Sequence, residues 1–490
     1  MRAFVFAVLT VVLSSVATGN AQDMPAAEAS SPRQLVIPNG VWAGDLDEMF
    51  ERRMIRVYAP FSRSLYFTDK GQERGIAVEL ARDWERYLNF KYAKALGKRP
   101  LTIYVMPATR DKLLPGVEYG LADVAIGNLT VTEERLRQVD FVPGDEGRRA
   151  VNEFIVTGPK SPELGSLVDL AGKRIHVRKA SSYFESLQAL NERFKREGKP
   201  EVQLILVPDS LEDEDMMQML DAGLIELIVV DDWKAHMWSL VMPNIKVRPD
   251  LVLRANAQTG WAIRKNSPRL LAEIEDFFRN WAMKQGVADY RMNTYMKRVK
   301  EIKDPTAGAE YKRFREVLAL FEKYGSKYNF DPLMLAAQGY QESQLNPNAR
   351  SAVGAVGVMQ LMPATGEQMK VGDIHVTDAN IHAAAKYMDQ LMTRYFADAK
   401  LSDTDRTLFA FASYNCGPGN VAKARAEAER RNLDPDKWFN HVEIVIGQTV
   451  GLETTTYVRN IYKYYVAYRL TLDAQAEAEK ARREVAPDKD

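Results

Sequence analysis

Residues 351–363 read SAVGAVGVMQLMP, with small residues clustered in the middle of the stretch. Gly354, Ala355 and Gly357 have little or no side chain, so the backbone here can come close to a bound chain molecule. Gln360 adds a side chain that can make a polar contact with such a ligand. The stretch therefore predicts a loop beside a cleft for an extended ligand.

A helix is predicted just before this loop. Asp331 is a good N-cap and Pro332 loses no hydrogen bond in the first turn, whereas Asn346-Pro347 should end the helix. Glu342 then lies in the last turn, where the helix dipole disfavours its carboxylate and raises its pKa. A carboxyl group that is protonated near neutral pH is what protonation of a glycosidic oxygen requires. For an isolated glutamate, a solvated surface carboxylate would be the commoner case.

Two further motifs follow. Residues 412–421 read ASYNCGPGNV, which predicts a helix end, a Gly-Pro-Gly turn and a new helix start. Residues 453–461 read ETTTYVRNI. Together with the Glu-Ser pair at 342–343 and the loop at 351–363, these motifs closely resemble the soluble lytic transglycosylase domain of the family 1 lytic transglycosylases. The resemblance implies a lysozyme-like all-α fold and cleavage of the glycan strands of peptidoglycan.

The resemblance also implies roles for individual residues. Glu342 matches the catalytic acid/base, Ser351 matches a serine that stabilises the reacting sugar, and Tyr414 is expected to hydrogen-bond the catalytic carboxyl group. The other implied cleft residues are Gln360, Asn415, Glu453 and Tyr457. For Glu453 and Tyr457, structural helix packing is an equal alternative to contact with the substrate.

The implied mechanism uses one carboxyl group, whereas most glycosidases use two at a fixed separation. Glu342 would protonate the bond between N-acetylmuramic acid and N-acetylglucosamine, and the muramic 2-acetamido group would stabilise the cationic centre. The ionised Glu342 would then deprotonate the muramic C6 hydroxyl, whose attack closes a 1,6-anhydro ring. Hydrolysis of the lysozyme type is the alternative, because a sequence does not show whether a second carboxylate lines the cleft.

The preceding part of the chain has a different pattern. Short apolar runs at 54–58, 101–105, 123–126 and 224–230 alternate with amphipathic stretches such as 76–88. This alternation predicts an α/β domain with mostly parallel sheets. From about Asp304 onward a 3.6-residue apolar period takes over, which predicts an all-α domain.

The α/β part contains a candidate anion site. Thr132 is a predicted N-cap with Glu133 and Glu134 in the first turn, and Arg135 can bind a carboxylate through its guanidinium. A structural Arg–Glu pair is the alternative. Residues 120–143, with LVDLAGKRI at 167–175 and GWAIRK at 260–265, resemble the two-lobed family 3 solute-binding proteins. That resemblance implies that Arg135 holds the carboxylate of an amino acid, Asp231 its amine, and Asn128 and Thr130 further polar contacts.

Together these patterns predict a multi-domain chain. The expected parts are a signal peptide at 1–21, a flexible tether at 22–44, a periplasmic-binding-protein-like regulatory domain at 45–300 with its second lobe at about 145–250, a linker helix at 301–320, the catalytic domain at 321–473 and a charged tail at 474–490. The domain order resembles the membrane-bound lytic murein transglycosylases of the F type, in which the first domain is thought to respond to amino acids or wall-derived muropeptides.

The composition and the N-terminal residues limit the possible binding partners and the cellular compartment. The chain has 66 Lys+Arg and 66 Asp+Glu, so overall charge gives no argument for a nucleic-acid partner. A single cysteine, Cys416, excludes an intrachain disulfide and a CxxC metal site, and we expect no cofactor or metal. In residues 1–21 a positive charge, an apolar core and a small-residue cleavage site follow one another as in a secretory signal peptide, which predicts a periplasmic protein. Peripheral placement at the inner face of the outer membrane rests on the resemblance alone.

One functional alternative of another class remains. The α/β domain could capture an amino acid or peptide for transport or sensing, while the helical domain only grips the wall. The presence of Glu342, Ser351 and Tyr414 disfavours it.

Overall fold

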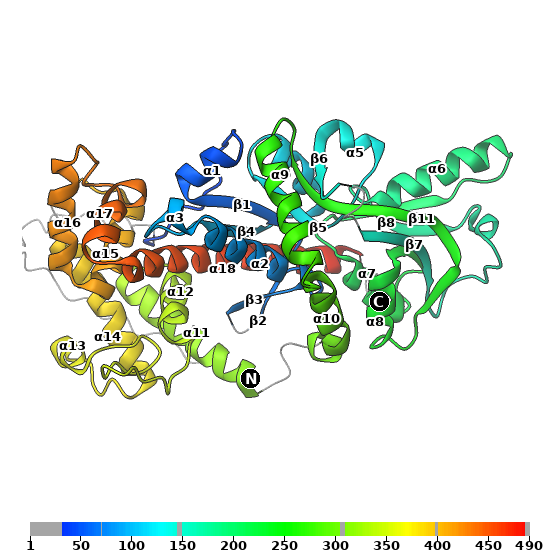
Figure 1. Cartoon of the computed structure of the whole chain (residues 1–490). Coiled ribbons are helices and arrows are strands. Elements are labelled where there is room, and N and C mark those ends of the chain that lie inside the picture. The colour runs from blue at the N-terminus through cyan, green and yellow to red at the C-terminus, as the bar shows by residue number, and fades with distance from the viewer. Residues whose placement is uncertain (1–31, 70, 145–148, 304–308, 397–399, 486–490) are drawn as a thin grey trace, which may run out of the picture.

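The computed structural model describes residues 32–69, 71–144, 149–303, 309–396 and 400–485. Figure 1 shows an α/β part and an all-helical part beside it, which confirms the predicted fold class. The predicted signal peptide lies outside the described residues. Among the residues that the structure describes, no helix is long and apolar enough to cross a membrane.

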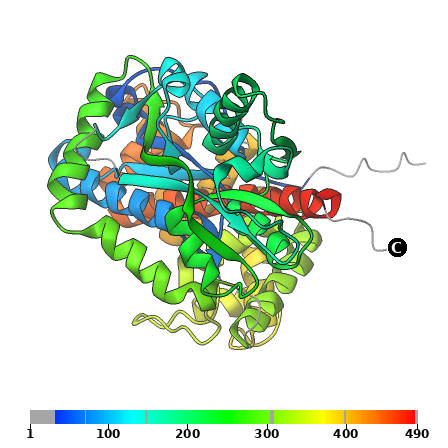
Figure 2. The ribbon, with the colours of Figure 1, turned by 90° about the vertical axis from the view of Figure 1, so that its right-hand side faces the viewer.

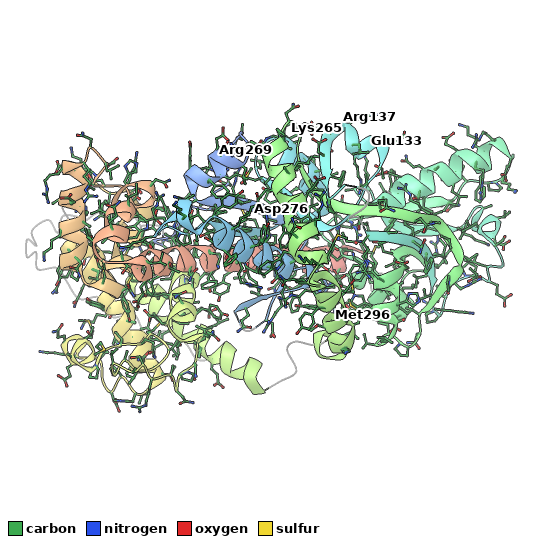
Figure 3. All side chains as sticks on the ribbon, viewed as in Figure 1. Glu133, Arg137, Lys265, Arg269, Asp276 and Met296 are labelled. Atoms are coloured by element: carbon green, nitrogen blue, oxygen red, sulfur yellow. The ribbon has the colours of Figure 1, made fainter. Side chains whose placement is uncertain are left out.

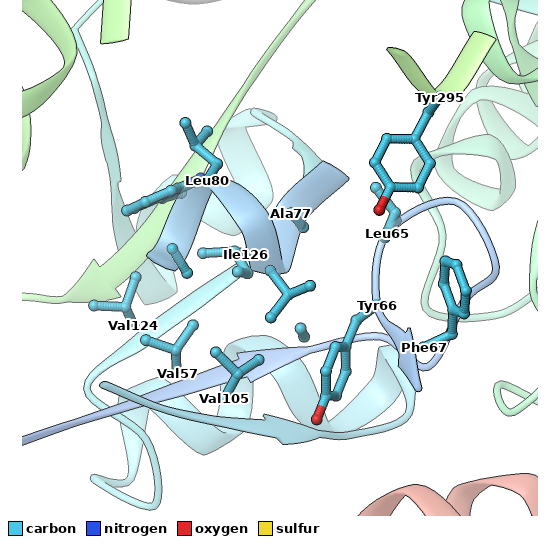
Figure 4. Packing of buried hydrophobic residues seen from close by; sticks show 14 of the residues in the cluster. Val57, Leu65, Tyr66, Phe67, Ala77, Leu80, Val105, Val124, Ile126 and Tyr295 are labelled. Carbon is cyan, nitrogen blue, oxygen red and sulfur yellow. The ribbon is translucent and has the colours of Figure 1, made fainter. Parts of the chain in front are cut away.

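The first lobe of the α/β part is built on parallel strands. Strand β1 lies between β4 and β5, and helix α2 packs its apolar stripe against them. Figure 4 shows this core, in which Leu80 of α2 lies over Val57, Val124 and Ile126 of the strands. The elements are α1 Leu46–Arg52, β1 Met54–Ala59, β2 Phe67–Asp69, β3 Gln72–Arg74, α2 Ile76–Lys91, α3 Ala93–Leu96, β4 Thr102–Pro107, α4 Arg110–Glu118, β5 Val124–Thr130, α5 Glu133–Gln138, β6 Val139–Val142, α9 Pro268–Phe277 and α10 Val287–Lys303.

The second lobe continues the same nine-stranded sheet, whose order is β4-β1-β5-β11-β7-β10-β8-β9 with β6 paired to β11. The prediction of a mostly parallel sheet is wrong, because half of the pairings in this sheet are antiparallel. Three of the four antiparallel pairings involve the long strand β11, which runs from the second lobe back into the first, and the fourth joins β10 to β7. The elements are β7 Arg149–Thr157, β8 Arg174–Arg178, α6 Ser182–Arg196, β9 Gln203–Val207, α7 Asp213–Asp221, β10 Leu227–Asp231, α8 Asp232–Ser239 and β11 Lys246–Arg264.

The all-helical part lies where the 3.6-residue apolar period of the sequence predicted it. Its core gathers Phe321, Met334, Phe409 and Trp438, all fully buried. Within the described residues from 309 onward, β-pairing is limited to isolated bridges. The helices are α11 Ala309–Tyr328, α12 Pro332–Ser343, α13 Pro363–Met369, α14 Thr377–Gln390, α15 Asp403–Cys416, α16 Pro418–Arg430, α17 Glu443–Thr449 and α18 Leu452–Val485.

Helix α18 joins the two parts. In Figures 1 and 2 it runs from the helical part along the α/β part to the second lobe. Along the way Tyr462 packs edge-on against Tyr104 of β4 at 5.6 Å between ring centres, and near its end Arg482 donates to Asp215 of α7 at 2.5 Å. Residues 474–485, which composition assigned to a charged tail, are thus the last turns of a helix docked on the first domain.

The predicted tether differs from the structure in its described part. The expectation of a flexible tether is wrong for residues 32–44, because Leu35 is buried, Arg33 pairs with Asp389 at 2.8 Å, and the Arg56 guanidinium stacks on Trp42 at 4.1 Å. Anchoring side chains among the small residues explain the difference. Of the linker helix expected at 301–320, the structure describes the end of α10 at 303 and the start of α11 at 309, and residues 304–308 lie outside the described residues.

Candidate active site

Glu342 lies in the last turn of α12, as the caps predicted. The Asp331 side chain accepts from the Leu333 N–H at the start of the helix, and Gln344 ends it in the left-handed conformation. The Tyr457 hydroxyl of α18 donates to Glu342 Oε1 at 2.5 Å. Gln338, one helical turn before Glu342, donates to the same hydroxyl at 3.2 Å. The carboxyl group is thus held by the Tyr457 hydroxyl, which Gln338 in turn orients.

Burial raises the pKa of Glu342 to about 7, and the hydrogen bond from Tyr457 opposes that shift. The main cause of this raised pKa is the burial of the carboxyl group by the surrounding protein. Among the described residues, no second carboxylate contributes to this pKa. Burial and the Glu342 charge together hold the pKa values of Tyr414 and Tyr457 well above the usual value, so both hydroxyls stay protonated donors.

The predicted partner of the carboxyl group needs correction. Tyr414 donates to the backbone carbonyl of Met359 at 2.9 Å, and the partner of Glu342 is Tyr457. Because Met359 belongs to the loop after α12, Tyr414 fixes that loop beside the carboxyl group instead of binding the carboxyl directly.

The loop at 351–363 is held by its own polar groups. The Gln360 amide donates to the carbonyls of Gly357 at 2.8 Å and Ala349 at 3.2 Å, and Ser351 Oγ accepts from the Ala355 N–H at 3.0 Å. Gly357 has a φ of +78° and a Cβ there would lie 2.5 Å from the Asn380 amide. Gly357 is therefore required by packing and backbone conformation, a role that the sequence did not reveal.

The remaining predicted cleft residues come from α15 and α18. Asn415 accepts a hydrogen bond from the Thr454 hydroxyl at 2.6 Å, which ties the end of α15 to the start of α18. Glu453 is exposed in the first turn of α18. The structure thus brings Glu342, Tyr414 and Tyr457 together, with the Ser351 and Gln360 loop attached to them.

A second candidate site lies between the two lobes of the α/β part. A cavity of about 320 Å³, the inter-lobe cavity, is lined by all four residues predicted to bind a ligand: Asn128, Thr130, Arg135 and Asp231. Asn128 donates to Asp231 at 2.5 Å across the cavity, and Ser182 of the second lobe donates to Thr130 at 3.1 Å.

Arg135 is turned toward this cavity. Its neighbours in α5, Glu133 and Arg137, project from the outer side of the lobe in Figure 3 and are exposed. The Arg135 guanidinium pairs with Glu185 of α6 at 3.0 Å. Glu185 is a cavity residue that sequence reasoning missed, although its place in the first turn of α6, after the Ser181 cap, was a usable signal.

Comparison with known proteins identifies both parts. Residues 54–297 match the bacterial extracellular solute-binding proteins, family 3, and residues 319–437 match the Transglycosylase SLT domain. A protein named membrane-bound lytic murein transglycosylase F from Desulfosudis oleivorans is 28% identical over 78% of this chain and 85% of its own length. One of the same name from Ectopseudomonas mendocina is 29% identical over 86% of this chain and 85% of its own length. A solved structure titled an ancestral arginine-binding protein bound to arginine is 25% identical, covers 50% of this chain and 99% of its own, and has a TM-score of 0.40.

Proposed function

We propose that this chain, which belongs to the lytic murein transglycosylases carrying a family 3 solute-binding domain ahead of an SLT domain, cleaves glycan strands with Glu342 as its only acid/base. The observation that carries the proposal is the state of Glu342. It is a half-buried carboxyl group with a pKa of about 7, and one tyrosine hydroxyl donates to it. Such a group can donate a proton and then take one back near neutral pH.

The cleavage follows from this one group. Protonated Glu342 donates to the oxygen between N-acetylmuramic acid and N-acetylglucosamine as that bond breaks. The muramic 2-acetamido oxygen stabilises the sugar cation, and Tyr457 stabilises the ionised Glu342 by its hydrogen bond. Glu342 then removes the proton of the muramic C6 hydroxyl, which closes the 1,6-anhydro ring, so the carboxyl group is regenerated and no water is consumed.

The substrate contacts follow the predicted residues. Ser351 and Gln360 present the loop to the glycan strand, and the cleft is bordered by Tyr414, Asn415, Glu453 and Tyr457.

Product analysis with purified peptidoglycan tests the proposal against its two alternatives. A lysozyme-type hydrolase would yield products heavier by one water than anhydromuropeptides, and a wall-binding module would yield no product at all.

We further propose that ligand binding in the inter-lobe cavity regulates cleavage. Helix α18 supports this proposal, because Tyr457 at one end contacts Glu342 and Arg482 near the other end contacts Asp215 of α7. The neighbouring Asp213 lines the inter-lobe cavity. A change in the relative position of the lobes would therefore be transmitted to α18, the helix that holds the catalytic carboxyl group.

Turnover measured with and without amino acids or muropeptides tests the regulation. We expect the rate to change in the wild type and the response to be lost in Asp231→Asn. Identical rates across the whole panel would exclude a regulatory role for these ligands.

We also propose that the chain is exported and acts at the inner face of the outer membrane. Two observations support this placement. Residues 1–21 resemble a secretory signal peptide, and the similar proteins are named membrane-bound. Cell fractionation tests it, since the chain should be recovered with outer-membrane vesicles and released by salt.

A further inference from the structure

Asn380 of α14 is fully buried and uses its side-chain amide on three backbone groups. Its Nδ2 donates to the carbonyls of Val356 at 2.9 Å and Ile374 at 3.0 Å. Its Oδ1 accepts from the Met359 N–H at 2.9 Å. The nitrogen and the oxygen of the amide are therefore both bonded, and two of the three hydrogen bonds reach the loop at 351–363.

Two other side chains hold the same stretch of the loop from other helices. Ser343 of α12 donates to the Val358 carbonyl at 2.7 Å, and Tyr414 of α15 donates to the Met359 carbonyl at 2.9 Å. Val358 and Met359 are buried, so an unpaired peptide group there would cost free energy. A segment whose peptide groups are bonded by side chains keeps its shape only while those side chains stay in place.

Gly357 lies directly on the Asn380 amide. A Cβ at this position would lie 2.5 Å from Asn380 Nδ2, and its three nearest atoms would all belong to the Asn380 side chain. With its φ of +78°, this glycine is required both by its backbone conformation and by the close approach of the loop to the amide. Asn380 bonds the loop on both sides of Gly357, at Val356 and at Met359, so it fixes the position of the small residues that were predicted to face a bound chain.

The acid/base is held by a different side chain. Tyr457 of α18 donates to Glu342, whereas all three hydrogen bonds of Asn380 go to backbone groups outside that pair. The loop and the carboxyl group can therefore be disturbed separately.

We propose that Asn380 is the positioning residue of the glycan-binding loop: it sets the affinity for the glycan strand and leaves proton transfer by Glu342 unchanged. The inference rests on the proposed function in taking the loop at 351–363 as a contact of the strand. Asn380 acts through the loop, because its own side chain is fully buried.

The kinetics of cleavage with soluble, uncross-linked glycan strands test this. Asn380→Ala loses both hydrogen bonds to the loop, so strand binding has to order the loop, and KM should rise about tenfold with kcat nearly unchanged. The alkaline midpoint of the rate, near the Glu342 pKa of about 7, should stay in place because Tyr457 keeps its bond to Glu342. Asn348→Ala is the matched control: the exposed Asn348 side chain makes no hydrogen bond within the described residues, and its loss should leave KM unchanged.

Gly357→Ala disturbs the same contact from the side of the loop, because its methyl group would meet the amide. It should also raise KM, and it decides the question alone if thermal denaturation shows that Asn380→Ala does not fold. In the double variant the methyl group finds room where the amide was. The KM of the double variant should then be no higher than that of Asn380→Ala, whereas independent sites would multiply their effects.

An unchanged KM in either folded single variant, a shifted alkaline midpoint, or multiplied effects in the double variant would overturn the inference. Calorimetric titration of Glu342→Gln with the same strands, with and without Asn380→Ala, should show the same loss of affinity in the absence of turnover. If Glu342 were not the acid/base, the products would change and this difference in affinity would remain, so the two failures can be told apart.

Discussion

Replacing Tyr457 by phenylalanine removes the one hydroxyl, among the residues that the structure describes, that donates to Glu342. That hydrogen bond stabilises the carboxylate and lowers its pKa, while burial raises the pKa to about 7. A hydrogen bond to a charged group contributes about 1.5–3 kcal/mol, and one pKa unit corresponds to about 1.4 kcal/mol. The pKa of Glu342 in Tyr457→Phe should therefore rise by about one to two units. Because cleavage needs the protonated form first, activity falls as pH rises through this pKa.

The assay is the rate of anhydromuropeptide release as a function of pH. The alkaline limb, with a midpoint near the Glu342 pKa of about 7 in the wild type, should move to higher pH in Tyr457→Phe. Tyr414→Phe is the matched control, because its hydroxyl donates to the Met359 carbonyl and its loss should leave the midpoint in place. An unchanged midpoint in Tyr457→Phe, or an equal shift in Tyr414→Phe, would refute the assignment of Tyr457 as the partner of Glu342.

Three further predictions concern stability. Because the pKa of Glu342 is raised in the folded state, the folded chain loses stability as pH rises from about 4.5 to 7. Glu342→Gln should therefore stabilise the chain by at most about 3 kcal/mol at about pH 8 and have little effect at about pH 4, which thermal denaturation at the two pH values can show. Glu443→Gln leaves the buried Arg459 without its charged partner and should cost about 3–5 kcal/mol in denaturant unfolding. Asp331→Ala removes the N-cap of α12 and a bond from Tyr465 at 2.9 Å, and should cost about 1–2 kcal/mol, whereas a neutral result would mean that the cap does not hold the catalytic helix.

Much of the fold was predictable because its signals are local. The alternation of apolar runs gave the strands of the first lobe, and the caps at Asp331 and Pro332 gave the helix that carries Glu342. The loop motif at 351–363 predicted a cleft beside Glu342, and the structure places that loop next to α12 through the bond from Tyr414 to the Met359 carbonyl. These features depend on neighbouring residues, so the sequence alone contains them.

The rest depends on contacts between distant residues. Which tyrosine meets Glu342 is set by the docking of α18 on α12, and nothing near Tyr414 or Tyr457 in the sequence distinguishes the two. The same holds for the end of α18, where the buried Ala478 and Ala481 are too small to produce an apolar period among charged residues. The pairing of Arg135 with Glu185 likewise joins two lobes of the sheet.

The mass of the products released from purified peptidoglycan tests the central claim most directly. The account predicts anhydromuropeptides, lighter by one water than hydrolysed muropeptides, from the wild type and no products from Glu342→Gln. Products that carry the added water, or normal turnover in Glu342→Gln, would contradict it.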